Sequence, residues 1–125
     1  MKTVLAVVAL MAGAPLLEGF DVPVMPGLAE VPEARVTFDK EEGSIIETVL
    51  EGSVETGRVQ TWYAGSLSGL GWMLESATAA RQVYRRGADR LVIDYSRETG
   101  KGADGATRVR LLREPAESRS PESQP

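Results

Sequence analysis

Apolar and polar residues alternate along two neighbouring stretches of the chain, which is the pattern of half-buried β-strands. The first stretch covers residues 35–38 and the second covers residues 44–51, and a charged segment at residues 39–43 separates them. Because side chains alternate between the two faces of a strand, every second residue of the longer stretch shares a face. The residues on its apolar face are Ile46, Thr48 and Leu50. The pattern therefore predicts a β-hairpin.

The spacing of the apolar residues becomes helical after a break at residues 52–57. Thr56 is the expected N-cap, because its hydroxyl can accept a hydrogen bond from the first turn. Gly69 and Gly71 are expected to end the helix. The apolar side chains that share one stripe of this helix are Val59, Trp62, Tyr63, Leu67 and Leu70. We expect both aromatic residues of this stripe, and Trp72 after it, to belong to the hydrophobic core.

Further strand patterns follow the helix, at residues 72–75, 82–85, 91–95 and 107–113. The expected order is thus a β-hairpin, one helix and then three to four strands. This order predicts an α+β fold with a curved antiparallel sheet and the helix packed on one face of it.

The N-terminal residues have the layout of a secretory signal peptide, which we assign to residues 1–19. Lys2 supplies a positive start, and residues 4–17 are a mostly apolar run that is short for a membrane-spanning helix. Cleavage after Ala14 fits the small-x-small pattern, although the proline that follows is unfavourable, and cleavage after Gly19 is the alternative. A buried N-terminal helix or an uncleaved anchor remains open as another interpretation of this run.

Composition divides the remaining chain into three parts. Residues 20–34 contain three prolines and are expected to form an extended leader that packs onto the core through its apolar side chains. Residues 35–114 are expected to form a single α+β domain. Residues 115–125 lack large apolar side chains and are expected to be a disordered tail.

Two packing motifs carry a resemblance to known proteins. They are the run Met25-Pro26-Gly27-Leu28 and the helix with Trp62-Tyr63 that ends in Leu70-Gly71-Trp72. In this respect the chain resembles a loose group of small uncharacterised exported proteobacterial proteins, whose Trp-Tyr helix ends in Leu-Gly-Trp. The resemblance covers about residues 20–114. It implies export to the periplasm and an antiparallel sheet, and it implies no catalytic residue.

The composition excludes several kinds of chemistry. The chain contains no histidine and no cysteine. It therefore lacks the usual general base at neutral pH, the commonest zinc ligands and the Ser-His and Cys-His nucleophile pairs. We expect no catalytic residues, no metal site and no cofactor.

One glycine-rich segment matches the spacing of a dinucleotide-binding loop. Gly100, Gly102 and Gly105 follow a predicted strand. The dinucleotide fingerprint requires that such a loop open a helix, whereas residues 106–112 alternate as a strand. The segment is therefore predicted to be a hairpin loop.

Charge is unevenly distributed along the chain. Residues 20–80 contain three basic and ten acidic residues, whereas residues 81–119 contain ten basic and six acidic residues. In the last predicted strand, Arg108 and Arg110 alternate with apolar residues, so both should lie on its solvent face. They are expected either to pair across the sheet with Glu47 and Glu51 or to form a patch for an anionic partner.

These observations favour a non-catalytic exported envelope protein of the bacterial periplasm. We expect a binding or interaction module whose partner is unknown, either an envelope protein or an anionic envelope component. No nucleic-acid partner and no integral membrane segment after processing are expected. The alternative is a small enzyme that uses carboxylates and arginines alone, since histidine and cysteine are absent.

Overall fold

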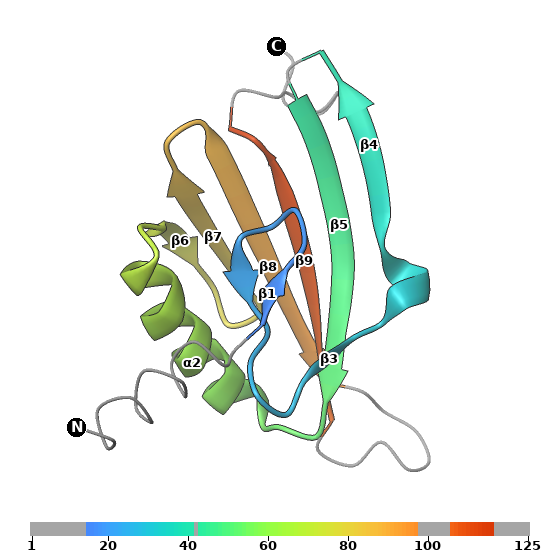
Figure 1. Ribbon diagram of the computed structural model, residues 1–125. Helices are drawn as coiled ribbons and strands as arrows, with labels where there is room; N and C mark the ends of the chain where they lie inside the picture. Colours follow the sequence, from blue (N-terminus) through green and yellow to red (C-terminus); the bar gives the residue numbers. More distant parts are fainter. Residues whose placement is uncertain (1–14, 42, 98–105, 117–125) are drawn as a thin grey trace, which may run out of the picture.

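Figure 1 shows the computed structural model, which describes residues 15–41, 43–97 and 106–116. The predicted α+β class and the order of hairpin, helix and further strands are confirmed. The main elements are β4 (Val36–Lys40), β5 (Gly43–Gly52), α2 (Thr56–Gly69), β6 (Met73–Ala77), β7 (Arg81–Arg86), β8 (Asp89–Arg97) and β9 (Thr107–Pro115). Four short elements precede them: β1 (Leu16–Leu17), β2 (Val22–Pro23), β3 (Ala29–Glu30) and the 3-10 helix η1 (Pro32–Ala34).

The described strands β3 to β9 form one seven-stranded antiparallel sheet, which has the expected curvature (Figure 1). Its order is β3-β5-β9-β8-β7-β6, and β4 also pairs with β5. In the predicted hairpin, Phe38 lies opposite Ile45 and Val36 lies opposite Glu47. The last strand, β9, lies between β5 and β8, so the sheet joins the two ends of the domain.

Helix α2 packs on one face of the sheet, as predicted (Figure 1). Its buried residues, Val59, Tyr63 and Leu67, are spaced by four positions along the helix. The predicted N-cap is wrong, because Glu55 occupies the cap position and Thr56 is the first helical residue. The Thr56 hydroxyl instead shares a hydrogen bond of 3.0 Å with the hydroxyl of Thr107 in β9. A tertiary partner has thus replaced the local cap.

The segment before β4 covers the part of the sheet that α2 leaves open. Strands β1 and β2 form a hairpin of their own, which lies across the sheet beside α2 (Figure 1). Phe20, in the turn of this hairpin, is fully buried. Strand β3 then pairs with the end of β5. Helix and hairpin together therefore close the core.

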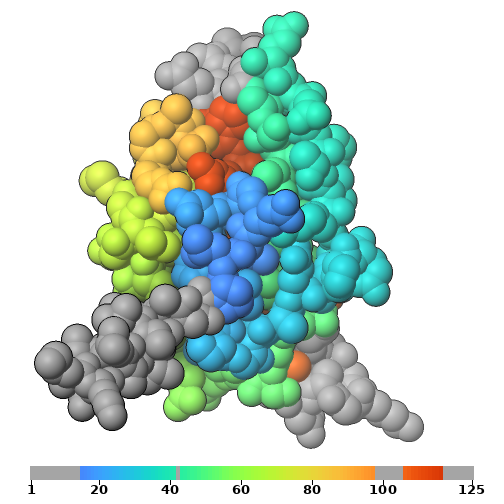
Figure 2. Space-filling view, in the orientation of Figure 1, coloured from blue at the N-terminus to red at the C-terminus, as the bar shows by residue number. Residues whose placement is uncertain are grey.

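This core lies between the sheet on one side and α2 with the hairpin on the other. Its largest fully buried side chains are Tyr63, Tyr84, Phe20, Leu50, Leu67, Leu91, Ile93 and Leu111. The space-filling view shows the hairpin and the following leader seated on the body of the domain (Figure 2). Residues from both halves of the chain therefore meet in one core.

Two predicted segments lie largely outside the described residues. The predicted signal peptide at residues 1–19 is described only from residue 15, where Leu16–Leu17 form β1. The predicted tail at residues 115–125 is described only to residue 116. At that end Pro115 closes β9, and the Ala116 N–H donates to the Ala88 carbonyl at 2.6 Å.

Gly52 is where the leader crosses the end of β5. A Cβ atom at this position would lie 2.0 Å from the Gly27 carbonyl oxygen and 2.8 Å from Leu28 Cδ2. Real Cβ atoms do not approach a backbone oxygen so closely, and neither backbone can yield without loss of the β3–β5 pairing. Glycine is therefore required here for space.

We expect Gly52→Ala to lower the free energy of unfolding by about 3 kcal/mol, the upper end of typical overpacking costs. Urea denaturation followed by tryptophan fluorescence measures the change. Gly57→Ala is the matched control, because a Cβ atom at Gly57 would meet nothing within 4 Å. An unchanged denaturation midpoint for Gly52→Ala would contradict the close crossing.

Candidate functional site

Arg108 and Arg110 project from β9 on the face of the sheet opposite the core. The structure pairs Arg108 with Glu51 and Arg110 with Glu47, both on the neighbouring strand β5. The register explains both partners: Glu51 lies directly opposite Arg108, and Glu47 is the diagonal neighbour of Arg110, which lies opposite Val49. Cross-strand pairing was one of the two alternatives for these arginines, and the anionic-partner patch remains a prediction.

The same face carries further arginine–carboxylate pairs. Arg81 contacts Asp94 at 2.6 Å, and this hydrogen bond and the Asp94 charge raise the pKa of the Arg81 guanidinium above its ordinary value. Arg90 in β8 contacts Glu114 in the neighbouring strand β9 at 2.9 Å. These pairs give the outer face alternating charge that is largely compensated within the sheet.

We expect the double substitution Arg108→Ser and Arg110→Ser to change stability little. Exposed pairs of this kind contribute about 0.2–1 kcal/mol each, because solvent screens them and long side chains must be ordered. Thermal unfolding measures the change. Binding of the wild type to anionic vesicles at low salt, lost in the double variant and at high salt, would instead establish the anionic patch.

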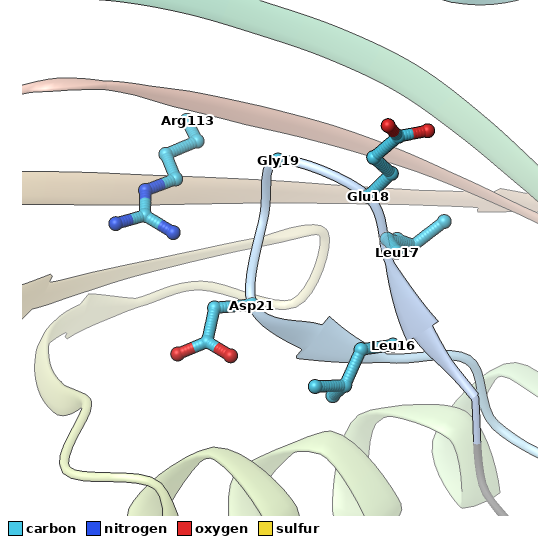
Figure 3. Close-up of a pocket in the computed structure, with 6 residues that line it drawn as sticks. All are labelled: Leu16, Leu17, Glu18, Gly19, Asp21 and Arg113. Atoms are coloured by element: carbon cyan, nitrogen blue, oxygen red, sulfur yellow. The ribbon is translucent and has the colours of Figure 1, made fainter.

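A shallow cavity of about 410 Å³ lies at the turn of the β1–β2 hairpin (Figure 3). Its lining residues are Leu16, Leu17, Glu18, Gly19, Asp21 and Arg113. In Figure 3 the carboxylates of Glu18 and Asp21 point to opposite sides of the turn. Paired acid–base catalysis requires two such groups to converge on one reacting bond. The carboxylates at this cavity do not converge in that way.

The charged groups beside this cavity hold the hairpin in place. Arg113 donates to the Phe20 carbonyl and, at 2.7 Å, to the Asp89 carboxylate. Arg86 contacts the Asp21 carboxylate at 2.9 Å. The two guanidiniums lie 4.5 and 5.3 Å from the centroid of the Trp72 ring, so they also make cation–π contacts. We call Trp72, Arg86, Arg113, Asp21 and Asp89 the tryptophan clasp.

A third arginine fastens the same hairpin from the side of β4. Arg35 donates to the Glu18 carbonyl at 2.8 Å and to the Glu30 carboxylate at 2.7 Å. Burial alone would raise the pKa of Glu30, but hydrogen bonds from Arg35 and Thr48 and the Arg35 charge hold this pKa below its usual range. These groups therefore act as structural anchors of the leader.

An uncharged groove of about 370 Å³ separates the hairpin from α2. The residues that line it are Leu16, Pro23, Trp62, Gly65, Ser66, Gly69 and Leu70. Trp62 is only partly buried and packs against the buried cluster without belonging to it, so the expectation that it is a core residue holds only in part. Its neighbour Tyr63 is fully buried, and the two rings meet edge to face with centroids 4.9 Å apart.

The buried tyrosines of the core have structural partners. The hydroxyls of Tyr84 and Tyr95 both donate to the Gln82 side-chain oxygen, at 3.2 and 2.7 Å. Burial is the largest cause of the raised pKa of Tyr95, and the nearby Tyr84 and Tyr63 raise this pKa further. These phenols therefore stay neutral and serve as hydrogen-bond donors within the core.

The described residues contain no group of three or more histidine, cysteine, aspartate or glutamate side chains that could hold a metal ion. The glycine-rich segment at residues 100–105 lies outside the described residues, and β9 rather than a helix follows it. A helix long and apolar enough to cross a membrane is absent from the described parts of the chain.

Comparison with known proteins gives no match to a family model, to a curated protein or to a solved structure. The candidate site is therefore derived from the geometry of this chain alone. Sequence patterns did not identify the groove or the clasp, because each depends on segments that are distant in the chain.

Proposed function

We propose that the protein is a non-catalytic exported module of the bacterial envelope that acts by binding a partner. The observation that carries this proposal is that the charged groups at the main cavity are engaged in holding the fold together. At the cavity in Figure 3, Asp21 and Arg113 hold the hairpin to the domain, and Glu18 points away from Asp21. Such groups supply stability instead of a reacting centre.

The surface of the domain supports binding better than catalysis. The cavity at the hairpin turn and the groove beside α2 are open clefts, and the core between sheet and helix is filled by large side chains. Enzymes usually enclose most of a small substrate, whereas interaction modules present exposed edges and shallow clefts. The enzyme alternative would need carboxylates and arginines to act on a substrate in this open setting.

Export is supported by the sequence pattern of the N-terminal residues. The contacts of strand β1 help to choose between the two cleavage positions of the signal peptide. Leu17 is buried, and the Val24 N–H donates to the Pro15 carbonyl at 2.8 Å. Cleavage after Gly19 would remove both contacts, whereas cleavage after Ala14 would retain them. We therefore favour cleavage after Ala14.

We expect mass spectrometry of the periplasmic product, expressed in a Gram-negative host, to show an N-terminus at Pro15. Ala12→Arg is the control, because a large charged residue disrupts the small-x-small pattern and should block processing. Recovery of the full-length wild type from the membrane fraction would contradict export and release. An N-terminus at Phe20 would contradict a role for β1 in the mature domain.

The binding proposal is tested with the C-terminally tagged mature protein and the envelope fraction of its own host. A component retained over an unrelated periplasmic control protein should bind the purified domain directly, with saturation in calorimetry. The enzyme alternative predicts consumption of an envelope component, and Glu18→Gln and Asp21→Asn would abolish that consumption. Such a loss of turnover would overturn the proposal.

A further inference from the structure

Strand β6 forms an open edge of the sheet. Within the described residues it pairs with β7 alone, and all five of its residues are exposed. Met73 is 72% exposed and Leu74 is 53% exposed. An edge strand offers unpaired backbone N–H and C=O groups, which can pair with another extended chain. In β6 the exposed side chains of Met73 and Leu74 lie beside these backbone groups.

The two edges of the sheet differ in their protection. Strand β4 at the other edge contains Lys40 and Asp39, and η1, which begins at Pro32, lies one residue before it. Lysine and proline are devices by which natural edges resist further pairing. The sequence of β6, Met-Leu-Glu-Ser-Ala, contains neither, and its protection is limited to Glu75 and a register shift between Leu74 and Ser76. Such bulges occur at edges and also at binding sites.

A cleft of about 340 Å³ lies at the start of β6. The residues that line it are Gly71, Met73, Leu74, Glu75, Arg85, Arg86 and Gly87. The cleft is therefore lined by the backbone of two glycines, by two apolar side chains, by one carboxylate and by two guanidiniums. The cleft adjoins the free edge, so a side chain from an added strand can enter it.

The two guanidiniums of this cleft differ in how closely a carboxylate engages them. Arg86 is engaged by Asp21 at 2.9 Å and by the Leu70 carbonyl at 3.1 Å. Arg85 has weaker contacts, with Glu75 at 3.8 Å and the Gly87 carbonyl at 3.3 Å. Arg86 is thus already paired with Asp21, whereas Arg85 has only the longer contact with Glu75, so an acidic group from outside would complement Arg85.

We propose that β6 is a strand-addition site for an extended peptide segment of a partner, in which an acidic side chain alternates with apolar ones. This inference rests on the proposed binding function and names its surface and partner chemistry. The register supplies the detail. Met73 lies opposite Arg85 and shares its face of the sheet, whereas Leu74 lies opposite Tyr84 and shares the core face. On that face the acidic side chain of the added strand lies beside Met73 and reaches past it to the Arg85 guanidinium, one strand further in, and on the other face its apolar side chains meet Leu74.

The test uses a blocked heptapeptide with valine at odd positions and threonine, glutamate and threonine at even positions. The matched probe has lysine in place of glutamate. Binding is followed by backbone amide shifts and amide hydrogen exchange in the full-length domain. We expect both changes to centre on residues 73–77, with the glutamate peptide bound about three- to tenfold more tightly.

Three variants assign the binding to the edge. Leu74→Lys should weaken the glutamate peptide about tenfold or more, because it removes an apolar contact and protects the edge. Phe38→Lys on β4 is the matched control, since Phe38 is 55% exposed, and it should leave binding unchanged. Arg85→Glu should reverse the preference between the two peptides, and circular dichroism checks that each variant is folded.

The outcomes separate this inference from the proposed function. Equal binding of both peptides, amide changes at β4, or an unaffected Leu74→Lys variant would overturn strand addition at β6. A dimer of the wild type in sedimentation that Leu74→Lys dissolves would make a second copy the occupant and would also overturn it. A partner that binds elsewhere on the domain would leave the proposed function standing.

Discussion

Replacing Tyr63 by alanine should lower the free energy of unfolding by about 3–5 kcal/mol, as for other large-to-small changes of buried aromatic residues. The ring is fully buried between α2 and the sheet. Its hydroxyl donates to the Pro23 carbonyl at 2.8 Å and accepts from the Met25 N–H at 3.2 Å. One side chain therefore joins the helix, the core and the leader.

Tyr63→Phe separates the two contributions of this side chain. It keeps the ring but leaves the Pro23 carbonyl and the Met25 N–H without their buried partner, which costs about 1–3 kcal/mol. Equilibrium urea denaturation measures both variants, and amide exchange at Met25 should accelerate in Tyr63→Phe. Exchange and stability at wild-type levels in this variant would show that the hydroxyl does not hold the leader.

Replacing Trp72 by alanine should also cost about 3–5 kcal/mol. The indole is 2% exposed, and the guanidiniums of Arg86 and Arg113 lie 4.5 and 5.3 Å from the centroid of its ring. Its removal leaves a cavity under the β1–β2 hairpin and takes the aromatic surface away from both cations. Thermal and urea unfolding measure the loss. We further expect faster amide exchange in β1 and β2, because the tryptophan clasp holds this hairpin.

Two control variants test whether burial explains that loss. Trp72→Phe should cost much less than Trp72→Ala, since the indole Nε1 has no hydrogen-bond partner among the described residues and phenylalanine removes this donor. Trp62→Ala makes the same chemical change at a partly exposed ring beside the groove. An equal loss at Trp62 and Trp72 would contradict the difference in burial.

The sequence by itself determined the kinds and the order of the elements. Alternation at residues 44–51 and the spacing of Val59, Tyr63 and Leu67 follow from the periods of a strand and a helix, which are local properties of the backbone. The structure places β5 and α2 at these positions. Local patterns were sufficient for the helix, the hairpin and the later strands.

Only the tertiary structure decided which residue of the aromatic pair is buried. Trp62 and Tyr63 both belong to the apolar stripe, but adjacent residues point in directions about 100° apart around a helix. The sheet and the leader enclose Tyr63, while Trp62 lies at the groove beside Pro23. Periodicity gives the direction of a side chain, and the neighbouring segments decide how completely it is covered.

The sequence named Glu47 and Glu51 as candidate partners of Arg108 and Arg110, and the fold decided which carboxylate meets which arginine. Arg108 meets Glu51 and Arg110 meets Glu47 across separations of 57 and 63 residues, because β9 inserts beside β5. The same holds for the β1–β2 hairpin, which contains two residues in each strand. Strands so short gain too little from local pairing to offset their lost conformational entropy. They form because the completed sheet offers Leu17 and Phe20 a buried surface.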